Sequence, residues 1–247
     1  MLAIDAKGLV KRYGARTAVD GLNLQIEAGE LFALLGVNGA GKTTAIRMLT
    51  GLTAPDGGDA LLMGHSVITD LDAVKRITNL SPQESAVAPR LIVRENLELM
   101  AEIYGAGPTE ARQLAARAME EFDLMEVARQ RAGTLSGGWQ RRLSIAMALI
   151  TQPQVLFLDE PTLGLDVLAR RELWKLVRGL HGRVTILLTT HYMEEAEELS
   201  DRVGILQKGR LRALGTPGEL IERAGANSFE EAFVALAAEE GGEDACV

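Results

Sequence analysis

The chain has 247 residues, enough for one large α/β domain with a full hydrophobic core but not for two complete domains of that size. Apolar residues make up 47% and charged residues 24% of it, without low-complexity tracts, which argues against a disordered chain. The 26 basic and 34 acidic residues give a net charge of −8, so we expect no nucleic-acid partner.

The cysteine and the N-terminal segment bear on location. Cys246, in an acidic C-terminal tail, is the one cysteine of the sequence, so no intramolecular disulfide can form. A reducing compartment such as the cytosol fits this. Met1–Lys7 carries an acidic residue where a signal peptide would be apolar, and no apolar run approaches the roughly 20 residues of a membrane helix. We expect any role at a membrane to depend on a partner protein.

Several apolar segments predict strands. Leu22–Ile26 alternates apolar and polar side chains, as a half-buried strand does. Leu31–Leu35 is continuously apolar, which is typical of a strand covered on both faces, and Val155–Leu158 and Val184–Leu188 repeat that pattern. Stretches of helical character separate these runs, so the order predicts a parallel sheet in an α/β fold.

The remaining pattern is helical. Between about residues 84 and 150, apolar residues recur at a spacing near 3.6, as in 93–104 and 111–122, which predicts an inserted helical subdomain. Ser228 can cap a short helix over residues 228–236, whose first turn is acidic. We expect a main domain over residues 1–220, followed by a short helical extension and tail over residues 221–247.

A phosphate-binding pattern, Gly36–Thr43, lies between the strand Leu31–Leu35 and the helix-like segment Thr44–Leu49. Glycines let the backbone curl until its N–H groups point at phosphate oxygens, and a helix N-terminus adds positive partial charge. We expect Lys42 to reach the β- and γ-phosphates and the Thr43 hydroxyl to bind Mg²⁺. A glycine-rich turn that binds nothing is the alternative, but a chance match has a probability on the order of a few per cent. The expected nucleotide-binding residues are Gly36, Val37, Asn38, Gly39, Ala40, Gly41, Lys42, Thr43 and Thr44.

An acidic pair, Asp159 and Glu160, follows the apolar strand Val155–Leu158. In open α/β sheets, ligands bind beyond the carboxyl ends of the strands. Neighbouring side chains on an extended backbone point to opposite sides, so we expect Asp159 to bind Mg²⁺ and Glu160 to lie beside the attacking water. Alone, such a pair is more often a solvated strand end; with the phosphate loop, it favours nucleotide hydrolysis.

The segment Leu135–Arg142, which begins Leu-Ser-Gly-Gly, resembles the signature motif of the ATP-binding subunits of the ABC family. The resemblance extends from Val10–Tyr13 through His191 to Gly215–Leu220, nearly the full chain. It implies a P-loop NTPase fold with a mostly parallel core sheet, an N-terminal antiparallel β subdomain and an inserted α-helical subdomain. The fifth signature position, often a polar or flexible residue, is Trp139 here.

The resemblance also implies roles for residues outside the phosphate loop. Tyr13 is similar to the aromatic residue that stacks on adenine, although an exposed strand tyrosine is the alternative. Gln83 resembles the glutamine that contacts Mg²⁺ or the attacking water and links the core to the helical subdomain. Ser136, Gly137 and Gly138 resemble the residues that close over the γ-phosphate of ATP held by another protomer. One chain alone would then lack part of its catalytic site.

Two further positions carry over from the family. Asp166, at the end of Gly164–Asp166, resembles the aspartate of the loop that crosses the dimer interface beside the nucleotide. His191 resembles the switch histidine, whose imidazole would face the γ-phosphate and bridge to the catalytic carboxylate and the water. A lone histidine is more often structural, and we interpret His65 and His181 in that way.

Together these features imply an Mg²⁺-dependent ATPase that pairs with a second copy of itself or a paralogue in an ATP-sandwich dimer. A membrane-spanning permease on a separate chain would be its partner, and the chain would lie peripherally on the cytoplasmic face of the cell membrane. Thr190–Glu197 and the short C-terminal helix look most like the branch that exports drugs, antibiotics and polysaccharides.

Two alternatives stay open at this point. One is a soluble ABC ATPase of DNA repair or of the ribosome, although such proteins normally carry a long coiled-coil insertion or two tandem domains, and this sequence shows neither. The other is a nucleotide switch that does not hydrolyse ATP, which would need a damaged catalytic centre.

Overall fold

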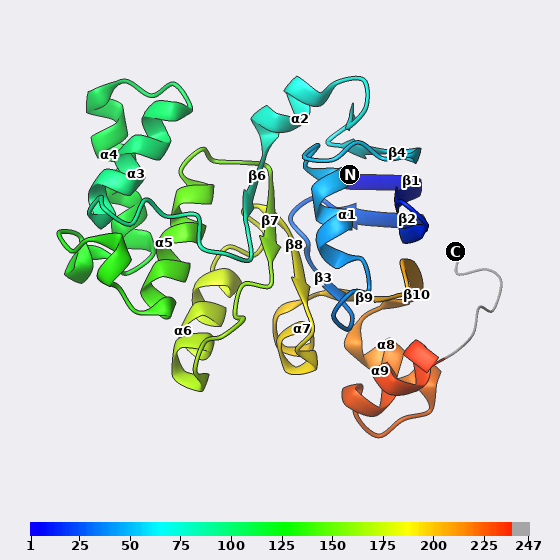
Figure 1. Cartoon of the computed structure of the whole chain (residues 1–247). Coiled ribbons are helices and arrows are strands. Elements are labelled where there is room, and N and C mark those ends of the chain that lie inside the picture. The colour runs from blue at the N-terminus through cyan, green and yellow to red at the C-terminus, as the bar shows by residue number, and fades with distance from the viewer. Residues whose placement is uncertain (239–247) are drawn as a thin grey trace.

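The computed structural model describes residues 1–238, and the strands in that part of the chain form two sheets (Figure 1). The four-stranded sheet has the order β2-β1-β4-β5, and the six-stranded sheet has the order β10-β9-β3-β8-β7-β6. The strands are β1 (Leu2–Tyr13), β2 (Arg16–Glu27), β3 (Leu31–Leu35), β4 (Gly57–Leu62), β5 (His65–Ser66), β6 (Thr78–Ser81), β7 (Val155–Asp159), β8 (Thr185–Thr190), β9 (Arg202–Gln207) and β10 (Arg210–Gly215). The helices are α1 (Lys42–Leu49), α2 (Leu71–Ile77), α3 (Val93–Ile103), α4 (Pro108–Glu121), α5 (Gly137–Leu149), α6 (Val167–Arg178), α7 (Met193–Leu199), α8 (Pro217–Ala224) and α9 (Phe229–Ala238), with the short 3₁₀ helices η1 (Met125–Val127) and η2 (Ala132–Thr134).

The centre of the six-stranded sheet is parallel and buried. β3 pairs in parallel with β8 and β9, β7 pairs in parallel with β8 and β6, and β10 lies antiparallel to β9 at one edge. Every residue of β3, β7 and β8 is buried, because helices or the second sheet cover both faces. The predicted parallel α/β fold is confirmed, and β8 begins at Thr185, one residue later than expected.

Different elements cover the two faces of this sheet. In β3, Leu31 and Leu35 belong to a hydrophobic cluster with residues of α5, α6 and α7. Phe32 and Leu34 alternate with them and belong to a second cluster, formed with α1 and the four-stranded sheet. Strand alternation therefore places the phosphate-loop helix α1 on one face and the signature helix α5 on the other.

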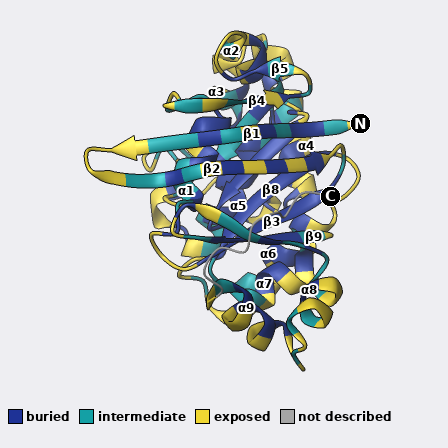
Figure 2. Cartoon of the chain, turned by 90° about the vertical axis from the view of Figure 1, so that its right-hand side faces the viewer, coloured by how far each residue is buried: buried dark blue, intermediate teal, exposed yellow. Residues whose placement is uncertain are grey.

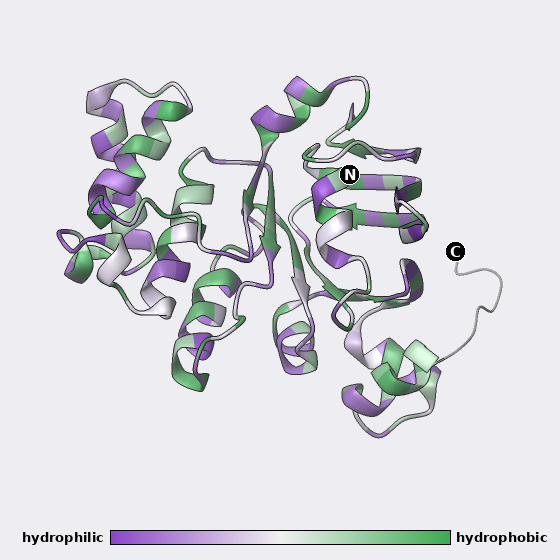
Figure 3. Ribbon diagram, viewed as in Figure 1, coloured by the Kyte–Doolittle hydropathy of each residue, from purple (hydrophilic) through white to green (hydrophobic). Residues whose placement is uncertain are grey.

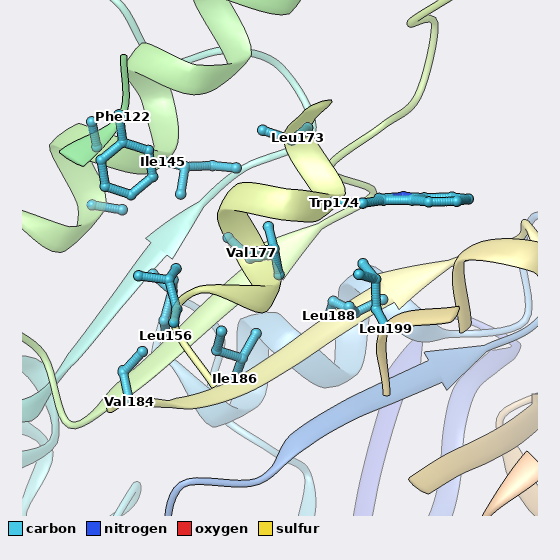
Figure 4. Packing of buried hydrophobic residues seen from close by; sticks show 14 of the residues in the cluster. Phe122, Ile145, Leu156, Leu173, Trp174, Val177, Val184, Ile186, Leu188 and Leu199 are labelled. Carbon is cyan, nitrogen blue, oxygen red and sulfur yellow. The ribbon is translucent and has the colours of Figure 1, made fainter. Parts of the chain in front are cut away.

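Figure 4 shows the packing of the first cluster. Leu156 of β7 and Ile186 of β8 lie against the helix that carries Leu173 and Val177, which is α6. All four side chains are 1% exposed or less, so this face of the sheet is closed to water. Close packing of this kind fixes the strands that end at the acidic pair and at His191.

The N-terminal sheet is antiparallel, with β1 paired to both β2 and β4. In β2, Leu22, Leu24 and Ile26 are buried whereas Asn23 and Gln25 are exposed, which is the alternation expected from the sequence. Figure 2 shows this banding along β1 and β2, whose inner face covers α1.

The helices between residues 84 and 150 fall into two groups. α3 and α4 pack on each other and stand away from the sheet, at the left of Figure 1. α5 contacts α3 and α4 but also β6 and β7, so it joins this helical pair to the core sheet.

The C-terminal region contains a helix that the sequence analysis did not predict. Thr216 accepts a hydrogen bond from Glu219 N at 3.2 Å, and Glu219 Oε2 accepts one from Thr216 N at 2.7 Å, a capping box that starts α8. The expected boundary at residue 220 lies inside α8. Ser228 caps α9 by accepting from Glu231 N at 3.2 Å. Cys246 and the predicted tail after residue 238 lie outside the described residues.

Hydropathy follows the layers of the fold. In Figure 3, hydrophobic residues gather on the core strands, and the outer helices carry both hydrophobic and hydrophilic residues. Within residues 1–238, no helix combines the length and the apolar composition that crossing a membrane requires.

Candidate active site

A cavity of about 490 Å³ opens where the phosphate loop meets the ends of β7 and β8. It brings together predicted residues from five separate segments, namely Tyr13, Asn38, Gly39, Gly41, Lys42, Thr43, Thr44, Gln83, Glu160 and His191. Arg16, Ala18 and Leu163 also line it and were not predicted. The carboxyl ends of parallel strands and the start of α1 therefore converge on one concave site.

Two glycines make the shape of the phosphate loop possible. A Cβ atom on Gly36 would lie 2.4 Å from the carbonyl oxygen of Leu206, too close for any side chain. Gly41 has φ +113°, and a Cβ there would lie 2.4 Å from the carbonyl oxygen of Ala18. The loop can therefore curl against β9 and β2 and present the N-terminus of α1 to the cavity, with its positive partial charge.

Lys42 is a buried cation at the start of α1. Its side chain is 5% exposed, and Nζ donates to the carbonyl oxygens of Gly36 at 2.7 Å and Val37 at 3.3 Å. Nζ also lies 3.1 Å from Glu160 Oε1. The ammonium group is thus fixed inside the loop, where it can neutralise an anion in the cavity.

Asp159 ends β7 and faces the phosphate loop. Its Oδ1 accepts hydrogen bonds from Thr43 Oγ1 at 3.2 Å and from Thr189 Oγ1 at 2.6 Å. Thr189, on β8, was not predicted. A carboxylate and a hydroxyl are hard oxygen donors of the kind that Mg²⁺ prefers beside substrate phosphates, so these residues fit a magnesium ion.

The expectation that Asp159 and Glu160 point to opposite sides is wrong. β7 ends at Asp159, and Glu160 has φ +48°, a left-handed conformation instead of an extended one. Both carboxylates consequently turn towards the phosphate loop: Asp159 to Thr43 and Glu160 to Lys42.

Glu160 lies between a cation and an imidazole. Its side chain is 8% exposed, with Oε1 near Lys42 Nζ and Oε2 2.5 Å from His191 Nδ1. The histidine follows β8, and its ring centroid lies 4.1 Å from that of Tyr192. This arrangement aims a carboxylate, a histidine and a lysine at the same part of the cavity.

The rim of the cavity comes from β1, β2 and the segment after β6. Tyr13 ends β1, is 48% exposed and lines the cavity. Arg16, its partner across the β1–β2 turn, donates from Nη2 to the carbonyl oxygen of Gly39 at 3.0 Å. Gln83, in the segment after β6, is exposed and also lines the cavity.

Eight predicted residues do not line this cavity: Gly36, Val37 and Ala40 of the phosphate loop, Asp159, which contacts Thr43, and four residues elsewhere, namely Ser136, Gly137, Gly138 and Asp166. Ser136 and Gly137 are exposed and Gly138 is partly exposed at the N-terminus of α5. Asp166 caps α6, its Oδ1 accepting from Leu168 N and Ala169 N at 2.9 Å each. None of these last four residues belongs to the cavity lining of a single chain.

Trp139 lies one residue beyond the exposed glycines of α5. Its ring packs against the main hydrophobic cluster, and Arg142 Cζ lies 4.8 Å from its ring centroid. The side chain is partly exposed, so the indole both packs inward and borders the surface that carries Ser136.

A family model described as ABC transporter matches residues 19–163 of the chain. The daunorubicin/doxorubicin resistance ATP-binding protein DrrA of Streptomyces peucetius is 44% identical over 91% of this chain and 68% of its own length. The Nod factor export ATP-binding protein I of Burkholderia thailandensis is 46% identical over 89% of this chain and 72% of its own length.

Solved structures agree with these relatives. An ATP-binding subunit of an ABC transporter superimposes with a TM-score of 0.83 at 29% identity, over 95% of this chain and 99% of its own. An ATP-binding cassette in a dimeric, post-hydrolysis state bound to ADP and phosphate superimposes with a TM-score of 0.77 at 25% identity, over 86% of this chain and 98% of its own. The chain belongs to the ABC transporter family, in the branch of the drug-resistance and export ATP-binding proteins, as an ATP-binding and ATP-hydrolysing subunit.

Proposed function

We propose that this chain powers export through a separate membrane-spanning permease, from a peripheral position on the cytoplasmic face of the cell membrane. The Streptomyces relative is named for drug resistance and the Burkholderia relative for Nod factor export, which supports an export role. ATP-driven closing and opening of a pair of subunits would supply the conformational change that the permease needs.

In this proposal the cavity binds one ATP molecule. Tyr13 stacks on adenine, since its aromatic ring lines the cavity and is partly exposed, and the backbone N–H groups of Gly36–Thr44 surround the phosphates. Lys42 exchanges its bonds to the loop carbonyls and to Glu160 for bonds to phosphate oxygens.

Hydrolysis is assigned to Glu160 and His191. Glu160 orients the attacking water and accepts its proton, and His191 fixes the carboxylate through the contact at 2.5 Å. The single observation that carries this assignment is the chain of contacts from Lys42 through Glu160 to His191 inside the cavity. It joins the phosphate-binding cation to the base and to a histidine that can sense the γ-phosphate.

Magnesium completes the site. The Thr43 hydroxyl, the Asp159 carboxylate and the Gln83 side chain would hold Mg²⁺, which when bound neutralises charge on the phosphates. Thr189 keeps the Asp159 carboxylate aimed at Thr43, through its hydrogen bond at 2.6 Å.

A second copy of the chain, or a paralogue, completes each site in this proposal. Ser136, Gly137 and Gly138 lie at the exposed start of a helix, which suits contact with the γ-phosphate of a nucleotide on another protomer. Asp166 lies in the exposed segment that would cross between the protomers. The dimeric state of the solved cassette supports this arrangement.

The helical pair offers a surface for the permease. α3 exposes Leu99 (41%) and Ile103 (67%), and Tyr104 at its end is 50% exposed. Tyr104 also lines a cavity of about 460 Å³ together with residues of α4. Exposed apolar side chains beside a hollow suit an apolar segment of a partner protein.

The assignment is tested with Glu160→Gln and Lys42→Ala. Glu160→Gln removes the base but keeps the shape, so ATP binding should stay close to wild type while turnover falls by at least about a hundredfold. Lys42→Ala should lose both. Glu121→Gln is the matched control, because Glu121 pairs only with Arg183 on the surface far from the cavity. A Glu160→Gln protein that hydrolyses ATP at the wild-type rate would show that another group is the base.

A further inference from the structure

Arg141, on the second turn of α5, makes an unusual set of hydrogen bonds. Its side chain donates only to main-chain carbonyls: Nε to Pro161 O at 2.7 Å, Nη2 to Asp159 O at 2.7 Å, and Nη1 to Pro82 O and, at 3.3 Å, to Gln83 O. The residue is 4% exposed. One guanidinium therefore links α5 to the end of β7 and to the segment after β6.

The bonded carbonyls lie beside the two side chains proposed above as the base and as a magnesium ligand. Asp159 and Pro161 are the residues on either side of Glu160, and Gln83 is bonded through its own carbonyl. Glu160 also has a left-handed backbone, which is uncommon in a residue with a side chain and needs contacts that hold it there. Arg141 supplies such a constraint from both flanks.

Burial of this cation has an electrostatic cost. Desolvation lowers the pKa of Arg141 to about 10, although nearby acidic groups, Asp159 first among them, oppose that change. The group remains charged at neutral pH. A buried charge is a poor means of stabilising a fold, because a well-packed apolar side chain does as well without the desolvation penalty. An apolar residue could not replace the several N–H donors of the planar Arg141 guanidinium.

We propose that Arg141 is a positioning residue for ATP hydrolysis, which fixes the Glu160 and Gln83 segments relative to α5. The inference rests on the roles proposed above for those two residues. The exposed residue Ser136 lies at the start of α5, about one turn before Arg141. If the start of α5 moves when the dimer closes over the partner's nucleotide, Arg141 passes that movement to the backbone beside Glu160. Arg141 makes no hydrogen bond to the phosphate loop, so it acts on turnover and not on nucleotide binding.

A purely structural role makes a different prediction. If Arg141 only neutralised the carboxylates around it, lysine would serve, because lysine keeps the charge. Lysine presents its donors from one nitrogen and cannot bond carbonyls of both segments in the planar geometry of a guanidinium. Arg141→Lys therefore keeps the positive charge but removes the hydrogen bonds to both segments, so it tests the two roles separately.

The experiment compares Arg141→Lys with Arg202→Lys. Arg202 is a matched control because its guanidinium also bonds several groups, Glu30 at 2.8 and 3.0 Å and Gln25 O at 2.8 Å, at the start of β9 and outside the cavity. We expect Arg141→Lys to lower kcat by at least about tenfold while the Kd for ATP stays within about threefold of wild type. Arg202→Lys should lower Tm and leave kcat per folded molecule unchanged.

Arg141→Gln is neutral and has two donors on one amide. It should likewise lower kcat while leaving the Kd for ATP close to wild type. The inference is overturned if Arg141→Lys turns over at the wild-type rate, or if kcat and ATP affinity fall together. It is also overturned if neither variant folds, because the arginine then serves the fold. Glu160→Gln is assayed in parallel: wild-type turnover in that protein would contradict the proposed base, and the comparison of Arg141→Lys with wild type would still stand.

Discussion

Two threonines on the buried strand β8 should differ sharply when each is replaced by valine. Thr189 is 0% exposed, donates to the Asp159 carboxylate at 2.6 Å and accepts from Glu160 N at 3.1 Å, whereas Thr185 is 2% exposed and accepts only from Gly29 N at 3.0 Å. A hydrogen bond to a charged group contributes ~2 kcal/mol and a neutral one ~1 kcal/mol. In a protein of this size, Thr189→Val should therefore lower Tm by ~4–8 °C and Thr185→Val by ~2–4 °C.

Activity should separate the pair further. Thr189→Val frees the carboxylate that faces Thr43, so kcat should fall by about tenfold, and the Mg²⁺ concentration for half-maximal rate should rise. Thr185→Val should keep wild-type kcat, because Thr185 lies at the opposite end of the strand. Thermal unfolding followed by circular dichroism and a phosphate-release assay measure both effects. Equal Tm and equal kcat in the two variants would refute the assignment of Thr189 to the site.

Two more predictions concern groups outside the cavity. Burial raises the pKa of Glu195, whose Oε1 accepts from Trp174 Nε1 at 3.1 Å, so the folded chain keeps a proton that the unfolded chain releases above pH ~4.3. The free energy of unfolding, measured by urea unfolding, should therefore fall between pH 5 and pH 7 in the wild type relative to Glu195→Gln. If the free energies of the two proteins changed with pH in parallel, the pKa of this carboxyl would not be perturbed. Ile103→Glu, at a side chain 67% exposed, should leave the ATPase activity of the isolated chain unchanged but abolish its co-purification with the permease. Normal co-purification would place the permease contact on another surface.

The parts of the site that local sequence determines could be predicted. The run from a buried strand through glycines to a helix sets its own geometry, because Gly36 and Gly41 occupy positions where a Cβ would collide with backbone. Continuous apolar runs likewise identified β3 and β7 as strands covered on both faces. The acidic pair was found for the same reason, since it ends such a strand.

Other residues reach the site only through tertiary structure. Arg16 comes from the return strand of the β1–β2 hairpin, and Thr189 from the strand beside β7, and no local pattern marks either one. The direction of the Glu160 side chain follows from its left-handed backbone. The prediction assumed an extended strand at this residue and therefore placed the side chain on the wrong side. Two helix starts did carry a local signal: Asp166 is an N-cap residue and Thr216 opens a capping box, and both were readable from the sequence.

The central claim is that each ATP site needs residues from two protomers, and mixing two inactive variants tests it most directly. Lys42→Ala removes the phosphate-binding cation, and Ser136→Arg blocks the exposed start of α5. Each variant alone should be inactive, and an equal mixture should regain about one quarter of wild-type ATPase activity, because half of the dimers are then mixed and each holds one intact site. Full activity in either variant alone, or no recovery in the mixture, would contradict the shared site.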